Sequence, residues 1–446
     1  MWNQKRTKCI FELAQYNWVI IPIIVAFIYR VLRWFGSEER GSYIVIDNTI
    51  HVAWSSLLCS LLLGPASPPT VLQFLTYCFP LRPFQLSEQP IQRSFNRLLI
   101  CLVTRGDQIE VVKRSVIAIQ DMYQKLDQRI SLHVLTEAAN AHNFHGMFKE
   151  HVWVHAVPLE YRPSKAKYKA RNLEWFRINM HIDKDDWVLH LDEETLVDEY
   201  CINTCLDFIT KQTCDMGQGV IHFNCHNFWS SVFTGVGDVR RIQGDYGDVQ
   251  WRLRWLNKAA VGIRGSFLLI RGSVENACTW DNDSLTEDYA FCLKAMKMGY
   301  SFGFIPAIAR ELSPATVGDF VRQRCRWYTG IRRLGDFWGY YVLLRTAAIA
   351  LQPLYYLASW PFLESSTVRQ PQWLYDLTVL GLSMGLGTTA WFTFLQDWDA
   401  GLSLAEMFTH QIQAIVYQPV VAIAEGYALL ISVLCPDEWF YVITKN

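Results

Sequence analysis

Charge is scarce in this 446-residue chain, which has 41 Lys and Arg residues against 42 Asp and Glu residues. Charged residues make up 19% of the sequence, compared with about 25% in typical soluble domains, and apolar residues reach 51%. The formal net charge of −1 argues against a nucleic-acid-binding protein, which normally carries an excess of basic residues. This composition also excludes a disordered chain and favours a protein with membrane-spanning segments.

Several well-known motifs are absent as well. The sequence has no GxxxxGK[ST] phosphate-binding loop, no HExxH motif, and no internal repeat with a period of roughly 20–50 residues. The first apolar run continues into Arg30-Val31-Leu32-Arg33-Trp34 rather than a small-residue cleavage site, so a cleaved signal peptide is not expected. Twelve cysteines in a chain of this length do not form a dense disulfide framework. Cys201 and Cys205 lack further ligands at metal-binding spacing, so no zinc site is predicted.

Five apolar stretches are candidates for membrane spans, which need about 20 mostly apolar residues. Two lie near the N-terminus and three near the C-terminus, at residues 13–29, 48–81, 346–363, 377–396 and 411–436. A buried core helix is the alternative for any one stretch, but their grouping at the two ends favours spans. Glu425 interrupts the last stretch, where it either pairs with another helix or contacts a lipid acceptor.

Basic residues near these stretches predict the orientation of the chain. They precede the first span and follow the second, at Lys5, Arg6, Lys8, Arg82, Arg93 and Arg97. This bias puts the N-terminus and the middle of the chain in the cytosol. We therefore expect a membrane region at residues 1–81, a cytosolic domain at 82–330, and interfacial and membrane helices at 331–446.

Strand and helix patterns alternate through the middle of the chain. Short apolar runs predict strands, and helical periodicity separates them. The predicted strands are residues 98–103, 132–135, 152–157, 187–191, 220–223 and 267–270, and the predicted helices are 110–126, 165–179 and 286–298. This alternation indicates an α/β fold with a mainly parallel sheet and helices on both faces. Ligands of such sheets bind beyond the carboxyl ends of the strands.

Acidic residues follow the strand at 187–191 directly, as Asp192-Glu193-Glu194. Alternate residues of an extended segment share a face, so Asp192 and Glu194 can converge on one hard divalent cation. Such an ion bridges the phosphates of a nucleotide. A solvated loop after a strand explains the same residues equally well.

Two further acids, Glu287 and Asp288, follow Thr286 at the predicted start of a helix. Thr286 is a plausible N-cap, and acids in a first turn also interact favourably with the helix dipole. Lys165, Lys167, Lys169 and Arg171 form either a solvated helix face or a phosphate clamp.

A third cluster, Gln323-Arg324-Cys325-Arg326-Trp327, precedes the C-terminal apolar stretches. Its arginines, together with Arg322, have the sign expected of positive residues on the cytosolic side of a span. That explanation does not require Gln323 or Trp327.

Taken in order along the chain, these motifs resemble those of the membrane-embedded family 2 glycosyltransferases, which include the cellulose, chitin and hyaluronan synthases. Within this family the chain is most similar to the egghead-type β-1,4-mannosyltransferases of glycolipid synthesis. The likeness begins at about residue 95 and lies in segments 103–107, 186–195, 217–219, 264–266, 287–288, 323–330, 419–425 and 440–442.

The resemblance implies a GT-A-type, Rossmann-like cytosolic domain flanked by transmembrane helices. It implies an inverting transfer of mannose from GDP-mannose to a lipid-linked acceptor such as glucosylceramide, with a β-1,4 linkage, in an ER or Golgi membrane or the plasma membrane. The alternative within the family is a processive synthase of hyaluronan or chitin type that uses UDP-sugars and a glycan acceptor. A transporter or lipid-binding membrane protein is the alternative from another class, and the location of the charged motifs in the middle domain opposes it.

The resemblance also implies roles for individual residues. Asp288 is the expected general base, with Glu287 beside it, and Asp192 and Glu194 are the expected ligands of Mg²⁺ or Mn²⁺. The expected donor-binding residues are Thr104, Asp107, Glu137, Lys169, Arg171 and Asp192. Those expected around the acceptor and the leaving diphosphate are Gly265, Ser266, Gln323, Arg324, Arg326 and Trp327. Glu137 departs from the family, which usually has Asp after the second strand.

Overall fold

A seven-stranded sheet organises the middle of the chain in the computed structural model, which describes residues 4–35, 67–80, 95–122, 127–148, 151–211, 214–225, 228–260, 262–363 and 372–435. The strands run in the order β3-β2-β1-β4-β6-β5-β7. They are β1 (Leu98–Val103), β2 (Ile130–Glu137), β3 (Val152–Val157), β4 (Trp187–Asp192), β5 (Met216–His222), β6 (Leu268–Arg271) and β7 (Phe302–Arg310). β6 runs antiparallel to both β4 and β5, and every other pairing is parallel.

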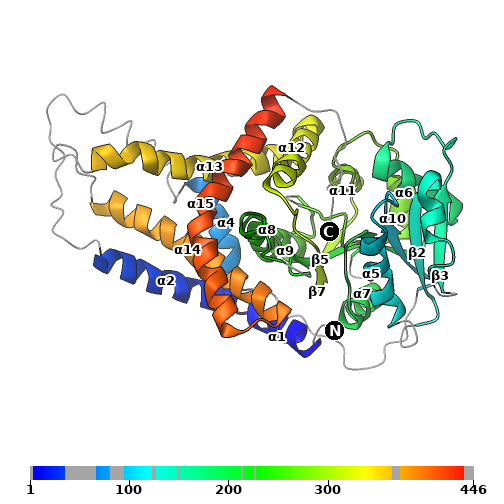
Figure 1. Ribbon diagram of the computed structural model, residues 1–446, viewed down its shortest axis with the longest axis horizontal. Helices are drawn as coiled ribbons and strands as arrows, with labels where there is room; N and C mark the ends of the chain where they lie inside the picture. The colour runs from blue at the N-terminus through cyan, green and yellow to red at the C-terminus, as the bar shows by residue number, and fades with distance from the viewer. Residues whose placement is uncertain are drawn as a thin grey trace.

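Helices cover both faces of the sheet, so most of its strands are buried (Figure 1). All six residues of β1 are buried, as are all nine of β7. The helices of this domain are α5 (Ile109–Gln120), α6 (Tyr168–Asn179), α7 (Glu199–Lys211), α8 (Val232–Gly244), α9 (Gln250–Trp255), α10 (Gly272–Cys278), α11 (Glu287–Lys297) and α12 (Val317–Leu334). A 3₁₀ segment, η2 (Ala138–Phe144), and a π-helical segment, η3 (Asp245–Val249), complete it. The prediction of a mainly parallel α/β sheet is confirmed.

One strand of the sheet, β7, is missing from the prediction. Gly303 and Pro306 lie inside it, and proline normally argues against a strand because it cannot donate a backbone hydrogen bond. In the structure, the pairing of β5 with β7 shifts register between Gln218 and Val220, and Pro306 falls in that irregular stretch. The irregularity accommodates the proline without ending the strand.

Long helices lie beside the sheet domain (Figure 1). They are α2 (Asn17–Phe35), α13 (Phe337–Leu363), α14 (Gln372–Ala400) and α15 (Leu404–Leu434), accompanied by the shorter α1 (Gln4–Ala14) and α4 (Pro68–Cys78). Among the described residues, three stretches are long and apolar enough to cross a membrane: Asn17–Trp34, Tyr375–Ala400 and Leu404–Leu434. They correspond to the first, fourth and fifth predicted spans, with shifted ends.

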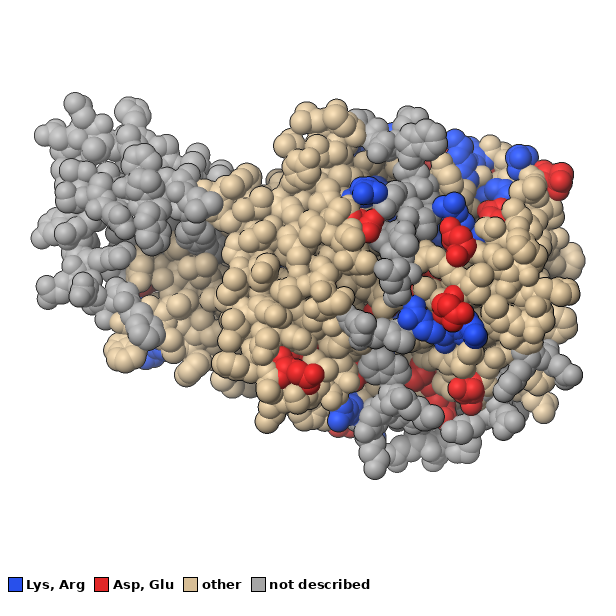
Figure 2. Space-filling view, in the orientation of Figure 1, with Lys and Arg blue, Asp and Glu red and all other residues tan. Residues whose placement is uncertain are grey.

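The other two predicted spans, at 48–81 and 346–363, are not among these three stretches. Of the stretch at 48–81, residues 48–66 and 81 lie outside the described residues, and α4, which covers Pro68–Cys78, has only eleven residues. The stretch at 346–363 forms the second part of α13, whose side chains are described as far as Tyr355. On the face seen in Figure 2, charged side chains gather over the sheet domain and are sparse over the long helices.

A buried polar network attaches the long helices to the edge of the sheet. Arg310, the last residue of β7, bonds to Asp399 of α14 at 2.7 Å and to Asp198 at 3.0 Å. It also donates to the hydroxyl of Thr7 in α1 at 2.8 Å. His222, at the end of β5, lies 3.2 Å from the same Asp399. The carboxyl ends of β5 and β7 are therefore fixed against α1 and α14.

Candidate active site

A single cavity of about 740 Å³ begins at the carboxyl ends of β1, β2 and β4 and continues between the long helices. This is the edge of the sheet where ligands of α/β proteins bind. Almost all of the predicted site residues line it: Thr104, Glu137, Lys169, Asp192, Glu194, Gly265, Ser266, Glu287, Asp288, Gln323, Arg324, Arg326 and Trp327. Two predicted residues, Asp107 and Arg171, do not.

The turn after β1 forms one end of the cavity. Thr104 donates its hydroxyl to Glu193 at 2.6 Å, and the backbone N–H of Gly106 donates to the same hydroxyl at 2.8 Å. Gly106 has a φ of +90°, and an added Cβ would lie 2.4 Å from the hydroxyl oxygen of Thr136. Only glycine suits this turn, because both the backbone conformation and the packing exclude a side chain.

Glu137 lies where β2 ends, and Arg171 holds it there. The guanidinium of Arg171 bonds to Glu137 at 3.0 Å and to the carbonyl of Tyr161 at 3.1 Å. Arg171 is thus behind the cavity wall, where it orients Glu137, and the structure does not bring it to the position expected for a diphosphate ligand. Asp107 also differs from the expectation: it is exposed and lies 3.4 Å from the side chain of Arg105.

Acidic side chains from β4 and α11 meet around Lys169. The Lys169 ammonium bonds to Asp192 and lies 3.6 Å from a carboxylate oxygen of Glu287. Burial raises the pKa of Glu287, and the nearby Lys169 partly offsets that effect. Burial lowers the pKa of the Arg326 guanidinium, and Glu287 and Asp192 oppose this shift. Two cations therefore balance the acids at this end of the cavity.

Asp288 is fixed by two backbone N–H groups at the start of α11. One carboxylate oxygen accepts from Gly265 at 2.8 Å, and the other accepts from Tyr289 at 2.8 Å. Gly265 permits this close approach, since an added Cβ would lie 3.0 Å from Asp288. Gly330 of α12 plays a similar part on the other side of α11, where a Cβ would lie 2.7 Å from Thr286.

The donor set at this end consists of carboxylate oxygens, which suit a hard cation such as Mg²⁺ or Mn²⁺. Within the described ranges, no group of three or more His, Cys, Asp or Glu side chains is arranged to hold a metal by itself. A divalent ion bound by Asp192 and Glu194 would therefore need further oxygen ligands from water or from the phosphates of a bound nucleotide.

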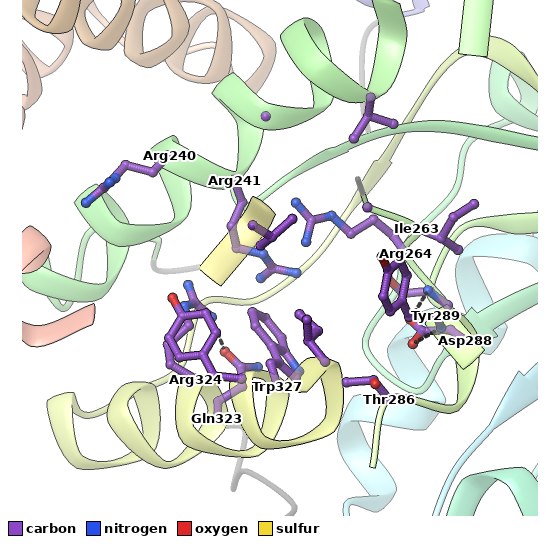
Figure 3. A pocket seen from close by; sticks show the side chains of 18 of the residues that line it. Arg240, Arg241, Ile263, Arg264, Thr286, Asp288, Tyr289, Gln323, Arg324 and Trp327 are labelled. Atoms are coloured by element: carbon purple, nitrogen blue, oxygen red, sulfur yellow. Dashed lines mark hydrogen bonds between the residues drawn. The ribbon is translucent and has the colours of Figure 1, made fainter. Parts of the chain in front are cut away.

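Aromatic and basic side chains form the opposite wall of the cavity (Figure 3). The guanidiniums of Arg324 and Arg241 lie 4.4 and 4.8 Å from the ring centre of Trp327. Arg324 also donates to Gln323 at 2.6 Å, so three neighbouring positions of α12 are fixed together. Burial, reinforced by Arg264, lowers the pKa of Arg241 to about 10.

Glu425 of α15 connects this wall to the long helices. Its carboxylate lies 3.5 Å from both Arg324 and Arg240. The pairing expected for an acid within an apolar helix is therefore present, and Glu425 lines the cavity as well. Beyond it, Gln352 of α13, Thr388 of α14 and Gln418 of α15 line the part of the cavity enclosed by the helices, which we call the helical arm.

Glu193, Arg241 and Glu311 are among the residues of the site that the sequence analysis did not identify as candidates. Glu311 directly follows β7 and accepts a hydrogen bond from Thr195 at 3.3 Å. Burial raises its pKa to about 7. An acid after a buried strand is the same signal that identified Asp192, but it was invisible here because β7 was not predicted. Arg241 lies inside α8 and has no local signal.

Comparisons with known proteins identify a family and several relatives. The family model for glycosyl transferase family group 2 matches residues 187–424. The chain is 32% identical over 243 residues to the β-1,4-mannosyltransferase egh of Drosophila melanogaster, covering 52% of each chain. It is 35% identical over 182 residues to the β-1,4-mannosyltransferase bre-3 of Caenorhabditis elegans, covering 39% of this chain and 40% of that one.

The matched part of the chain thus spans about half the length of these curated relatives, or less. Among solved structures, the chain is similar to a mannosyltransferase from Pyrobaculum calidifontis in complex with GDP-Man and Mn²⁺. The TM-score is 0.46 at 10% identity, over 87% of this chain and 99% of that one.

Proposed function

The chain belongs to glycosyl transferase family group 2, and on that premise we propose that it is an inverting membrane glycosyltransferase. It transfers mannose from GDP-mannose to a lipid-linked acceptor such as glucosylceramide and forms a β-1,4 linkage. The observation that carries the proposal is the single cavity that joins the carboxylates around Lys169 to Trp327 and to the helical arm. The names of the egh and bre-3 relatives support mannose as the transferred sugar.

Asp288 is the general base of the proposed reaction. An acceptor hydroxyl is a poor nucleophile, and a carboxylate within hydrogen-bond reach takes its proton as the new bond forms. The hydroxyl oxygen attacks the anomeric carbon from the side opposite the phosphate, and the electron pair of the broken bond leaves with the diphosphate. Attack on an α-linked donor therefore gives a β-linked product. The two backbone N–H groups that hold Asp288 keep its carboxylate in one orientation for this step.

The acidic end of the cavity binds the donor. Thr104 and Glu137 border the nucleoside, and Lys169 faces the diphosphate together with Arg326. Asp192 and Glu194 would hold Mg²⁺ or Mn²⁺, and the ion would supply positive charge to stabilise the leaving diphosphate. Arg241 and Arg264 contribute further positive charge to the wall near the same end.

The acceptor approaches from the Trp327 side. An aromatic ring offers a flat apolar face to the C–H groups of a sugar, and Gln323 supplies a hydrogen-bonding amide beside it. The helical arm suits the head group of a lipid, because the amides of Gln352 and Gln418 line it on helices that are mainly apolar. Two of the helices that bound this arm, α14 and α15, contain candidate membrane spans.

The proposed location is an ER or Golgi membrane, with the sheet domain on the cytosolic side. Three described helices can cross a membrane by length and composition. The excess of basic residues before the first span and after the second supports the orientation. In this scheme residues 82–330 form the glycosyltransferase domain, between a membrane region at 1–81 and interfacial and membrane helices at 331–446.

One observation supports a second candidate, a processive synthase that uses UDP-sugars. The cavity continues past Trp327 into the helical arm, and a growing polymer could follow the same route. This alternative predicts a series of products of increasing length, whereas the first predicts a single added sugar.

The test is incubation of the purified full chain in detergent with glucosylceramide and, separately, GDP-mannose, UDP-glucose, UDP-N-acetylglucosamine and UDP-glucuronic acid. Free GDP or UDP and the product mass are measured, with the Asp288→Asn variant as the control. Release of GDP with a mass increase of one hexose is the expected result. A ladder of products from a UDP-sugar would replace the first candidate by the second. No release of GDP or UDP from any donor, with or without glucosylceramide, would refute both.

A further inference from the structure

Lys169 holds an unusual place in the site. Its side chain is only 16% exposed, and its ammonium bonds to Asp192 while lying 3.6 Å from Glu287. These are carboxylates of β4 and α11, from two different elements at the acidic end of the cavity. Lys169 thus supplies the positive charge between these two acids, at a place where a divalent cation could supply it instead.

The backbone before Lys169 is shaped to put it there. Tyr168 has a φ of +52°, in the left-handed region that residues other than glycine rarely adopt. Such conformations persist where the surrounding structure enforces them, and they often occur at functional sites. Lys167, two residues earlier, is exposed to solvent and does not line the cavity. Of these two lysines, only Lys169 reaches the acids.

We propose that Lys169 is the counter-ion of the donor-free site, and that it gives up Asp192 to the divalent metal only when the nucleotide diphosphate arrives to accept its ammonium. This inference rests on the proposed function, because it assumes a metal-dependent nucleotide-sugar site. It adds an order of events: the metal and the nucleotide load together, and the metal does not bind tightly beforehand.

The physical reason is electrostatic competition. A divalent ion beside Asp192 would lie next to the Lys169 ammonium, and like charges at such distances repel strongly in a partly buried site. Arg326, the second cation that faces Asp192 and Glu287, adds to that repulsion. The diphosphate brings several negative charges, which give both the displaced ammonium and the metal new partners. Metal and nucleotide should therefore increase each other's affinity by the same factor.

The test measures Mn²⁺ binding rather than activity. Free Mn²⁺ is followed by electron paramagnetic resonance with the purified full chain in detergent, without nucleotide and with saturating GDP. Three proteins are compared: the wild type, Lys169→Met, and Lys167→Met as a matched control. Lys167→Met makes the same chemical change at a lysine that does not contact the acids.

We expect GDP to strengthen Mn²⁺ binding to the wild type by about 100-fold, within the usual range of coupling between sites. Lys169→Met should bind Mn²⁺ without GDP about 10-fold more tightly than the wild type, because removal of one neighbouring positive charge favours the cation. The enhancement by GDP should shrink accordingly in this variant. Lys167→Met should match the wild type in both measurements.

The outcomes separate the two proposals. Normal GDP-supported binding in the wild type, with unchanged or weaker metal-only binding in Lys169→Met, would refute the counter-ion role alone. Absence of Mn²⁺ binding to the wild type even with GDP would refute the metal-dependent donor site and, with it, the role of Lys169. Thermal unfolding is measured for every protein. If Lys169→Met does not fold, Lys169→Gln replaces it with the same expected result, since its amide keeps a hydrogen-bond donor but carries no charge.

Discussion

The proposed general base gives the sharpest test of the mechanism. Asp288→Asn preserves the size and shape of the side chain but removes its ability to take a proton. General-base catalysis typically contributes about 10²–10⁴ in rate, which corresponds to roughly 2.7–5.5 kcal/mol of activation free energy. We expect the Asn variant to lose about that factor in turnover. Affinity for the nucleotide sugar should stay near the wild-type value, because the base acts on the acceptor hydroxyl.

The structure also limits how far the Asn variant should be destabilised. Each carboxylate oxygen of Asp288 accepts one backbone N–H, from Gly265 and from Tyr289. An asparagine can accept only one of these bonds, and its NH₂ group would face the other donor. One lost bond and one unpaired donor cost about 1–3 kcal/mol in the free energy of unfolding. The variant should therefore unfold at a lower temperature but remain folded under assay conditions.

The assay measures turnover at saturating donor and acceptor, donor affinity by calorimetry, and thermal unfolding of the same preparation. Weakened metal-dependent donor binding, instead of lost turnover, would identify Asp288 as a metal ligand. Near-wild-type turnover in the Asn variant would contradict our reasoning and make Glu287 the next candidate. Glu287 is buried and shares Lys169 with Asp192, so its exchange for Gln would be the following experiment.

Four further predictions address the rest of the site and the topology. Chelation should abolish transfer, and added Mg²⁺ or Mn²⁺ should restore it; full activity of a metal-free preparation in excess chelator would count against the Asp192 and Glu194 site. Trp327→Ala should impair transfer to the acceptor more than donor binding, whereas a Trp that only packs would cost about 3–5 kcal/mol in stability and yield an unfolded variant. Asn282 in Asn282-Asp283-Ser284 should remain unglycosylated in a eukaryotic host, and a mass increase reversed by glycan removal would contradict the cytosolic orientation. The raised pKa of Glu311 means that the folded state binds more protons than the unfolded state between about pH 4.5 and 7. The wild type should therefore lose stability relative to Glu311→Gln as the pH rises through this window, and equal unfolding temperatures of both proteins at pH 5 and pH 8 would be inconsistent with it.

Sequence patterns predict a strand correctly where a short stretch of residues carries the whole pattern. Residues 98–103 and 152–157 form strands with the predicted ends, because each is a short run of mainly apolar side chains. β5 begins four residues earlier than predicted, since Gly217, Gln218 and Gly219 do not read as an apolar run. The failure at β7 has the same origin: Pro306 is tolerated only because the pairing with β5 is irregular there, and nothing in the sequence announces that irregularity.

The basic stretch near residue 169 shows what sequence alone could not decide. The sequence allows either a solvated helix face or a phosphate clamp, and in the structure each description fits different residues of the stretch. Lys165 and Lys167 are exposed, as a solvated face requires, while Lys169 enters the cavity and Arg171 turns behind it to hold Glu137. Tyr168, between the exposed Lys167 and the inward Lys169, has a positive φ, and such a conformation at a tyrosine has no signature in the sequence.

The contacts that attach the helices to the sheet join residues far apart in the sequence, so sequence patterns do not predict them. These contacts nevertheless affect the candidate active site. Arg310 and Asp399 are 89 positions apart, and their contact joins the end of β7 to α14. The next residue, Glu311, lines the cavity, so the same bond that anchors a candidate membrane helix also fixes one wall of the site. Glu425 makes a second connection, from α15 to the arginines around Trp327. An acceptor held by a bilayer can meet a donor held by the sheet only if the two parts keep a constant distance. These buried charge pairs help to maintain it, because removing one partner of a buried ion pair is strongly destabilising.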